Sequence, residues 1–151
     1  MPLTALTNSL KNINIEQLIW DIIDNRKKDI LALNTKDQLF DKGIDITGKS
    51  MFAKHPYAPS TVKRKKRKGQ PTDRVTLKDT GELHSEFNLL QTQTDIEIRH
   101  FGGMRGGVDL MSKLVEKYGE VEGLTEENVN KLTWDIVYPD LMIRIDGLLR
   151  T

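Results

Sequence analysis

The sequence contains no cysteine among its 151 residues, so disulfide bonds and thiolate chemistry are excluded. It also has no apolar run close to the ~20 residues that a membrane-spanning helix needs. The first residues, Met1-Pro2-Leu3, lack the basic start and the long apolar core of a signal peptide. We therefore expect a protein that is made in a cytoplasm and does not contact a membrane.

Apolar residues are slightly scarce and charged residues slightly frequent, since hydrophobic side chains make up 37% of the chain and charged side chains 30%. A chain of this length fits a single domain that spans residues 1–151. The core of such a domain is modest. We expect its extended parts to gain burial from neighbouring molecules.

The net charge is only +1, but the two signs are unevenly distributed. Residues 1–75 contain 15 Lys and Arg against 8 Asp and Glu, a net of +7, whereas residues 76–151 contain 8 against 14, a net of −6. Identical subunits could pack the basic half of one against the acidic half of the next, and such head-to-tail contacts build rings when the rotation closes. Alternatively, the two halves neutralise each other within one subunit.

The longest helical pattern lies in the first third of the chain. Residues 1–12 are mixed and polar, which predicts a flexible arm. From residue 13 to about residue 40, apolar side chains recur every three or four positions, and this spacing predicts a long amphipathic helix that stops before Gly43. Asn12 or Asn14 is the expected N-cap.

The middle of the chain has irregular and alternating patterns. Residues 41–78 predict an extended, basic loop region, because glycine and proline interrupt any regular spacing. Residues 84–101 contain two runs of alternating apolar and polar side chains around a polar turn, which predicts a β-hairpin. A glycine-rich loop follows at residues 102–107.

Helical spacing returns near the C-terminus. Residues 108–118 predict a short helix that ends at Gly119, and residues 125–150 predict a longer helix with Thr125 as its N-cap. Pro139 should kink the longer helix, because proline lacks an N–H group and clashes with the preceding turn. The expected fold class is α+β: a long N-terminal helix, a small antiparallel sheet with an extended basic loop, and C-terminal helices.

Six consecutive cations are the most prominent local feature of the sequence, namely Lys63, Arg64, Lys65, Lys66, Arg67 and Lys68. Adjacent like charges repel each other, so we expect these side chains to be solvated or to face an anion rather than to enter a core. Three interpretations stay open. The run could contact nucleic acid phosphates, contact an acidic surface of a partner protein, or form a solvated loop or the exposed start of a helix.

The sequence shows no catalytic or metal-binding constellation. The three histidines, His55, His84 and His100, lack the spacing of a helical metal site, although His84 and His100 could meet across the base of the hairpin. Glu82 and Glu86 are four residues apart, but the chain is predicted to become extended between them. We therefore expect no enzyme activity, no bound metal and no cofactor.

A tight corner is expected between the basic run and the hairpin. Asp79 or Thr80 can cap a short turn there, and Gly81 is the residue expected to adopt a positive φ. Replacing Gly81 with valine should then destabilise the corner.

The stretch from Tyr57 to Leu89 resembles the motif order of phage virion-morphogenesis and tail-completion proteins of the head–tail neck. These proteins commonly carry an aromatic residue, a proline and Ser/Thr, then a basic segment with a glycine, an apolar pair, and Thr-Gly-x-Leu before a β-hairpin. The same order occurs in this chain as Tyr57, Pro59, Ser60-Thr61, Lys63 to Lys68, Gly69, Val75, Leu77 and Thr80-Gly81-Glu82-Leu83. Segments 117–119 and 123–126 are similar to later parts of the family pattern.

This resemblance implies an α+β subunit that forms a ring with copies of itself between portal and tail, as a connector, a tail-completion ring or a tail terminator. The implied partners are other neck, portal or tail proteins and DNA passing through the lumen. The implied location is the virion, after synthesis in the host bacterial cytoplasm. The structural motif would comprise Tyr57, Pro59, Thr80, Gly81 and Leu83, and the six cations would contact a partner subunit or DNA. The alternative is a small DNA-binding protein that uses the same basic run.

Overall fold

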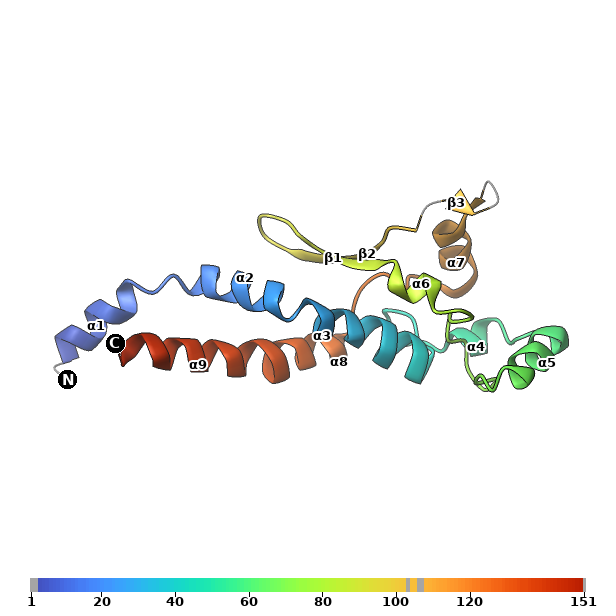
Figure 1. Ribbon diagram of the computed structural model, residues 1–151, viewed down its shortest axis with the longest axis horizontal. Coiled ribbons are helices and arrows are strands. Elements are labelled where there is room, and N and C mark those ends of the chain that lie inside the picture. The colour runs from blue at the N-terminus through green and yellow to red at the C-terminus, as the bar shows by residue number, and fades with distance from the viewer. Residues whose placement is uncertain (1–2, 103, 106–107, 151) are drawn as a thin grey trace. The chain divides into compact units, whose positions relative to one another are not determined.

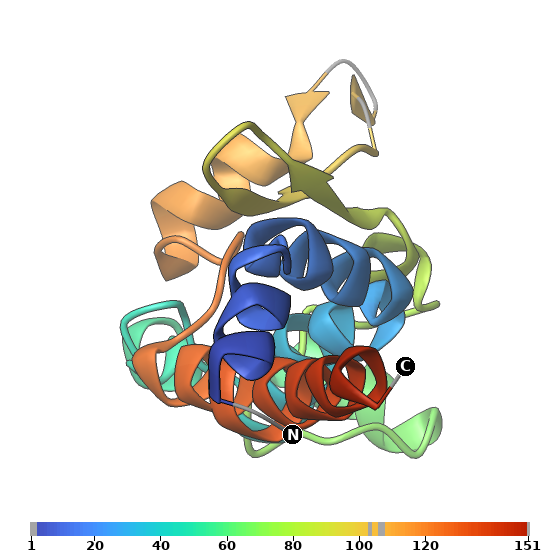
Figure 2. The same ribbon diagram turned by 90° about the vertical axis from the view of Figure 1, so that its left-hand side faces the viewer.

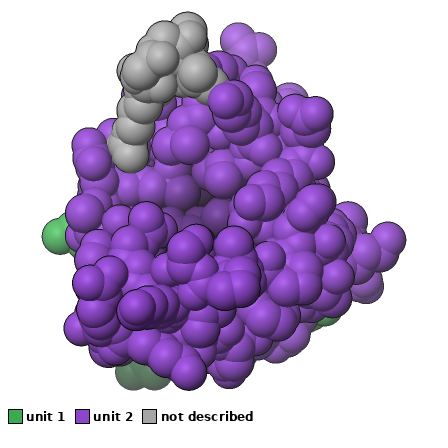
Figure 3. Space-filling model, turned by 90° about the vertical axis from the view of Figure 1, so that its right-hand side faces the viewer, with its two compact units in different colours: residues 1–30, 129–151 green, residues 31–128 purple. Residues whose placement is uncertain are grey.

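The computed structural model describes residues 3–102, 104–105 and 108–150. The chain divides into two units, which Figure 3 colours separately: a terminal unit of residues 1–30 and 129–151, and a central unit of residues 31–128. The expectation of one domain stays a prediction. Within the described residues, every helix is too short or too polar to cross a membrane.

The terminal unit is helical. It contains α1 (Leu3–Lys11), α2 (Ile15–Asn25), η2 (Leu132–Val137) and α9 (Tyr138–Leu149), together with parts of α3 (Lys27–Ala32) and α8 (Glu126–Lys131). The α2 helix packs beside η2 and α9, as the two views in Figures 1 and 2 show. Asn14 is its N-cap, since its side-chain oxygen accepts a 3.0 Å hydrogen bond from the Gln17 amide.

A bidentate ion pair joins the two chain segments of this unit. The Nε and Nη2 atoms of Arg26 donate to the two carboxylate oxygens of Asp140 at 2.8 and 3.0 Å. These hydrogen bonds hold the pKa of the Asp140 carboxyl below its usual value. The forked geometry fixes the orientation of α9 against the end of α2.

The final helical run accommodates Pro139 without an interruption. The η2 segment is a π-helix, and α9 follows it directly, so that Pro139 lies in the first turn of α9, where its missing N–H group is tolerated. The predicted helix over residues 125–150 is therefore three successive segments, α8, η2 and α9. Thr125 caps the first of them, because its hydroxyl accepts a 3.2 Å hydrogen bond from the Asn128 amide.

The central unit combines short helices with a β-hairpin. Its helices are η1 (Leu33–Lys42), α4 (Met51–Lys54), α5 (Pro59–Arg67), α6 (Glu82–Ser85) and α7 (Leu110–Tyr118). The hairpin pairs β1 (Phe87–Gln91) with β2 (Ile96–His100) in antiparallel register, with Leu89 opposite Ile98. A second short pair joins β3 (Met104–Arg105) to β4 (Val108–Asp109).

Three buried side-chain amides connect η1 to the segment before α8 and to α8 itself. The side chain of Asn34 donates to the carbonyls of Val121 and Gly123 at 2.9 and 2.6 Å. The Gln38 side chain accepts from the Thr125 amide at 2.9 Å, and Asn128 donates to the Leu33 carbonyl at 2.8 Å. These bonds satisfy backbone groups that would otherwise be buried without partners, which is why polar residues occupy the core here.

The predicted α+β fold class is confirmed, and so are the hairpin and the short helix that ends at Gly119. The single long helix that was predicted for the N-terminal third is divided in the structure. The backbone departs from helical geometry at Arg26, where α2 ends, and the chain continues as α3 and η1. Residues 3–11, expected as a flexible arm, form α1, which has no buried residue. Of the glycine-rich loop at 102–107, Gly103, Gly106 and Gly107 lie outside the described residues.

Residues 59–67 also differ from the sequence-based expectation, because they form helix α5 rather than part of an extended loop. Pro59 occupies the first turn, where its fixed φ favours a helix and its lack of an N–H group has no penalty. Four cations lie in the last turn, close to the negative end of the helix dipole. These two local effects offset the repulsion between neighbouring cations.

Candidate functional site

The six cations of the basic run have different environments on α5. Lys63, Lys66 and Arg67 are exposed and follow the i, i+3, i+4 spacing of one helix face. Arg64 and Lys65 belong to another face and line a pocket. Lys65 is the buried member of the run, whereas the other five cations, Arg64 at the pocket among them, are exposed.

Lys65 is buried, with 5% of its surface exposed, which corrects the expectation that all six cations stay outside a core. Its Nζ atom donates to the Lys78 carbonyl at 3.1 Å and to the Gln70 side-chain oxygen at 3.4 Å, and lies 5.1 Å from the centre of the Tyr57 ring. The long aliphatic stem explains the burial, because it packs against apolar surface while the ammonium keeps polar partners. Among the described residues, no carboxylate forms an ion pair with this ammonium.

Tyr57 connects this helix to the segment that follows it. Its hydroxyl accepts a 3.1 Å hydrogen bond from the Thr76 amide, and its ring meets Phe52 edge-on at 5.9 Å. Together with the contact to Lys65, these interactions place the aromatic residue of the motif between α4, α5 and residues 75–78. Tyr57, the aromatic residue of the motif, thus packs against other parts of the central unit.

The end of α5 is joined to Asp79 by two polar contacts. The Lys68 ammonium lies 2.6 Å from the Asp79 carboxylate, and the Gln70 amide donates to the Asp79 carbonyl at 2.7 Å. The hydrogen bond from Lys68 lowers the pKa of the Asp79 carboxyl. Of the six cations, Lys68 is the one with an ion-pair partner within the described part of the chain.

The corner after Asp79 has the predicted geometry. Gly81 has φ = +92° and precedes α6, and the Thr80 hydroxyl accepts a 3.3 Å hydrogen bond from the Glu82 amide. Leu77 also has a positive φ, of +51°, which is unfavourable for a residue with a branched side chain. This backbone strain lies beside a pocket.

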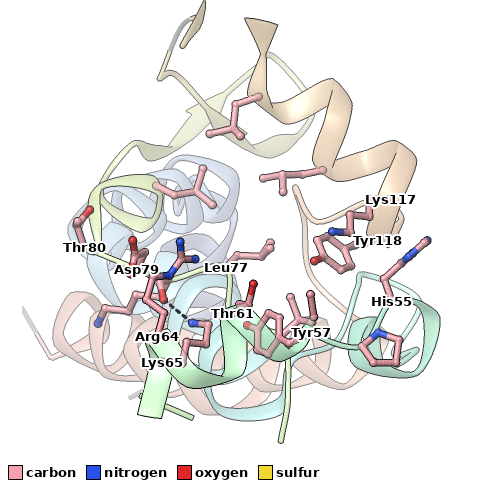
Figure 4. Close-up of a pocket in the computed structure, with 18 residues that line it drawn as sticks. His55, Tyr57, Thr61, Arg64, Lys65, Leu77, Asp79, Thr80, Lys117 and Tyr118 are labelled. Carbon is pink, nitrogen blue, oxygen red and sulfur yellow. Dashed lines mark hydrogen bonds between the residues drawn. The ribbon is translucent and has the colours of Figure 1, made fainter. Parts of the chain in front are cut away.

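Several of the residues described above, between Tyr57 and Gly81, line a pocket in the central unit. Its volume is about 530 Å³, and we call it the α5 pocket. The unit is hollowed on this face in Figure 3, and Figure 4 shows Arg64 and Lys65 on one wall with Lys117 and Tyr118 on the other. Apolar side chains form much of its lining: Pro56, Ala58, Val75, Leu77, Leu83, Leu110 and Leu114. Tyr57, Thr80, Gly81 and Leu83 of the motif all line it, whereas Pro59 starts the adjoining helix.

The chemistry of the α5 pocket favours binding over catalysis. Arg64, Lys65, Lys78 and Lys117 bring four cations to it, against the single carboxylate of Asp79, which Lys68 already pairs. An apolar lining with convergent cations suits a hydrophobic group that carries a negative charge. The expectation that the chain is not an enzyme stays a prediction.

The three histidines have separate environments. Burial lowers the pKa of His84, whose Nε2 atom donates to the Thr76 carbonyl at 2.9 Å. His100 lies 2.8 Å from the Glu86 carboxylate, and the ring of His55 meets Tyr118 at 6.2 Å. His84 and His100 therefore have different partners rather than each other. In the described residues, His, Asp and Glu side chains form no group of three that could hold a metal ion.

Sequence reasoning missed the wall of the pocket that α7 supplies. Leu110, Leu114 and Tyr118 recur every four residues and were expected on one side of a helix, which they are. Their spacing predicts a helix face but does not say which surface that face lines. No pattern in the sequence links them to Tyr57 or Leu77.

Comparison with known proteins found no protein-family model, no curated protein and no solved structure that matches this chain.

Replacing Gly81 with valine is expected to lower the free energy of unfolding by about 1–3 kcal/mol. A Cβ atom at Gly81 would lie 3.5 Å from the Lys78 side chain, an ordinary contact, so the loss comes from the positive φ and not from a clash. Chemical denaturation followed by circular dichroism measures the change.

Two other glycines test this explanation. Gly48 has φ = +81° and free space around it, so Gly48→Val should lose about as much stability. Gly147 has free space but lies inside α9 without a positive φ, so Gly147→Val should lose none. An unchanged stability in Gly81→Val would show that the corner tolerates other residues.

Proposed function

We propose that this protein is a structural component of a bacteriophage virion, a ring-forming head–tail connector or tail-completion protein that joins the portal or capsid to the tail. The observation that carries the proposal is the uncovered apolar surface of the terminal unit. The motif order of residues 57–89 supplies the link to phage neck proteins.

Among its described residues, the terminal unit exposes more large apolar side chains than it buries. Its buried ones are Ile22, Ile23, Ile30 and Leu132. Its exposed ones are Leu3, Leu10, Ile15, Val129, Trp134, Tyr138, Met142, Ile143 and Leu148, with Ile143 at 71% exposure. The rings of Trp134 and Tyr138 lie 5.5 Å apart, centre to centre, so that these two exposed side chains form one apolar patch. Exposed apolar patches mark surfaces on which a protein assembles with others.

The uneven charge supports assembly from identical subunits. A surplus of cations in residues 1–75 and of carboxylates in residues 76–151 favours contacts between unlike parts of two copies. A contact between unlike parts repeats around a ring when the rotation closes. A ring with a central lumen is the form that joins a portal to a tail and lets DNA pass.

The experiment that tests this proposal uses phage particles. Mass spectrometry of purified virions should detect the protein, and a cryo-electron microscopy map should place a ring of it at the head–tail junction. A phage that lacks the protein should accumulate filled heads and free tails, and the wild-type protein supplied in trans should restore joining. Absence of the protein from virions, with normal joining in the deletion, would end the proposal.

A second candidate function, DNA binding, is favoured by the outer face of α5. Lys63, Lys66 and Arg67 are exposed on one face and form no ion pair within the described residues. Exposed cations that gather on one helix face are the kind of side chain that contacts backbone phosphates. Such contacts would be independent of DNA sequence.

Replacing Lys63, Lys66 and Arg67 with glutamine tests DNA binding without disturbing the buried Lys65. Duplex binding should weaken, and the slope of log affinity against log salt should fall by about 3, because each lost phosphate contact removes close to one released counterion. A control variant with Lys11, Lys28 and Lys49 replaced by glutamine removes the same charge from scattered exposed positions. Equal losses in both variants, or no binding by the wild type at low salt, would rule out this site.

A further inference from the structure

An aromatic stripe lies exposed on the terminal unit. It consists of Trp134, Tyr138 and Met142, spaced four residues apart along η2 and α9, with exposures of 60%, 48% and 45%. The two aromatic rings are 5.5 Å apart, centre to centre, so that they present one continuous apolar surface. Trp and Tyr in such clusters are the residue types that most often dominate the energy of a protein interface.

The α5 pocket is an open site of complementary character on the central unit. Its volume of about 530 Å³ lies within the range of ~300–1,000 Å³ that is usual for ligand sites, and its lining is mostly apolar. Leu77, at the centre of the view in Figure 4, has a strained positive φ. Strain of this kind persists where the surrounding structure holds a side chain in a required place.

The charges of the two surfaces also match. Arg64 and Lys117 line opposite walls of the pocket, and the buried ammonium of Lys65 has no carboxylate partner in the described part of the chain. Asp135 follows Trp134 in η2 and lies on the adjoining helix face; it is an exposed carboxylate that has no ion-pair partner within the same residues. An apolar anchor beside a carboxylate is the chemistry that the pocket favours.

We propose that the aromatic stripe of one copy docks in the α5 pocket of a second copy, with the Trp134 side chain in the pocket and the Asp135 carboxylate near its cations. This inference rests on the proposed ring and specifies the contact that repeats around it. Because the stripe and the pocket are different surfaces, the contact is head-to-tail, and each copy offers one of each.

Two single substitutions separate the two halves of this contact. Trp134→Ala removes the anchor, and Thr61→Trp fills the pocket from within, because Thr61 lines it from α5. Each variant should self-associate about 30-fold or more weakly than the wild type, as expected for a central interface residue. Asp135→Asn should weaken association less, by roughly threefold to tenfold.

Mixing the two variants gives the sharpest result. Thr61→Trp keeps an intact stripe and Trp134→Ala keeps an intact pocket, so one contact can form between them but no second contact can extend it. Native mass spectrometry of the mixture should show a 1:1 heterodimer and nothing larger, whereas each variant alone should be monomeric. A symmetric contact through the stripe alone would not give this pattern.

Matched controls show whether the effects are specific. Ser60→Trp places the same residue one position earlier on α5, outside the pocket, and should associate like the wild type. Phe101→Ala removes an exposed aromatic side chain from the central unit and should also have no effect. Circular dichroism and melting temperatures verify that all of these variants are folded.

The inference is overturned if the wild type is monomeric at its highest soluble concentration, if both variants associate like the wild type, or if the mixture forms no heterodimer. If Thr61→Trp still self-associates but is no longer incorporated into particles, the pocket accepts a different neck protein, which also overturns it. In each of these cases the particle experiment can still find the protein at the head–tail junction, so the proposed function is judged separately.

Discussion

Replacing Asp45 with alanine is expected to lower the free energy of unfolding by about 2–4 kcal/mol. The Asp45 side chain is 3% exposed and forms a salt bridge with the Lys54 ammonium, which is one-third exposed. The same carboxylate accepts hydrogen bonds from the Thr47 amide at 2.9 Å, the Thr47 hydroxyl at 2.7 Å and the Lys49 amide at 3.0 Å. Alanine would leave these donors without a partner.

The destabilisation by Asp45→Ala should extend beyond the turn at residues 45–49. Lys54 also donates to the Tyr118 carbonyl at 2.9 Å, so the salt bridge joins this turn to α4 and to the end of α7. Because α7 forms one wall of the α5 pocket, Asp45→Ala should also loosen that wall. Asp73→Ala is the control, since the Asp73 side chain is 76% exposed and its ion-pair partner in the described part of the chain is its neighbour Arg74. This variant should change stability by less than about 0.5 kcal/mol.

The contribution of Asp45 should depend on pH in a defined direction. Burial raises the pKa of its carboxyl, but the hydrogen bonds from Lys54, Thr47 and Lys49 outweigh burial and leave the pKa below its ordinary value. A pKa that is lower in the folded than in the unfolded state stabilises the fold fully above about pH 4, and this stabilisation is lost as the pH falls further.

Urea denaturation of the wild type and Asp45→Ala at several pH values measures this effect. The difference in unfolding free energy should be constant from about pH 7 to 5. It should shrink below about pH 4, where the Asp45 carboxyl of the unfolded wild type binds a proton while that of the folded protein is still ionised. A difference in unfolding free energy that does not depend on pH down to about 3 would show that Asp45 stabilises the fold through packing and not through its charge.

Replacing Gly43 with alanine is expected to lower the free energy of unfolding by about 2–4 kcal/mol. Gly43 has φ = +63°, and a Cβ atom there would lie 2.9 Å from the Val75 carbonyl oxygen and 3.0 Å from the Arg74 Cβ. Backbone surrounds the site, and Arg74 holds it by donating to the Phe40 carbonyl at 2.8 Å, so it cannot relax easily. Alanine therefore adds a clash to the unfavourable φ.

Gly69 is a matched control for this prediction. Its φ of +65° is nearly the same, but a Cβ atom at that position would have no other atom within 4 Å. Gly69→Ala should therefore lose only the backbone part, about 1–2 kcal/mol. The difference between the two variants measures how closely η1 packs against residues 74–75, and equal losses would contradict that packing.

Several elements could be predicted from the sequence because their causes are local. The Asn14 and Thr125 caps, the end of α7 at Gly119 and the alternation in the hairpin each depend on residues that are close together along the chain. Hydrogen bonds of the backbone and the periodicity of side chains act over this short range. The positive φ of Gly81 belongs to the same class.

The α5 helix shows where local reasoning was incomplete. The glycines and prolines of residues 41–78 suggested an extended loop, but Pro59 at the first turn and the cations at the last turn both favour a helix. These effects are readable in the sequence, so the helix could have been predicted. The identity of the buried cation could not.

By itself, the sequence determined the α+β class, the hairpin, the helix caps and the glycine corner, because each depends on interactions between residues a few positions apart. Only the tertiary structure decided that Lys65 is buried, that α7 closes the α5 pocket, and that Trp134 and Tyr138 remain uncovered. Burial depends on which distant segments pack together. For Lys65 these are Tyr57, Gln70 and Lys78, whose contacts with its side chain exist only after the chain has folded.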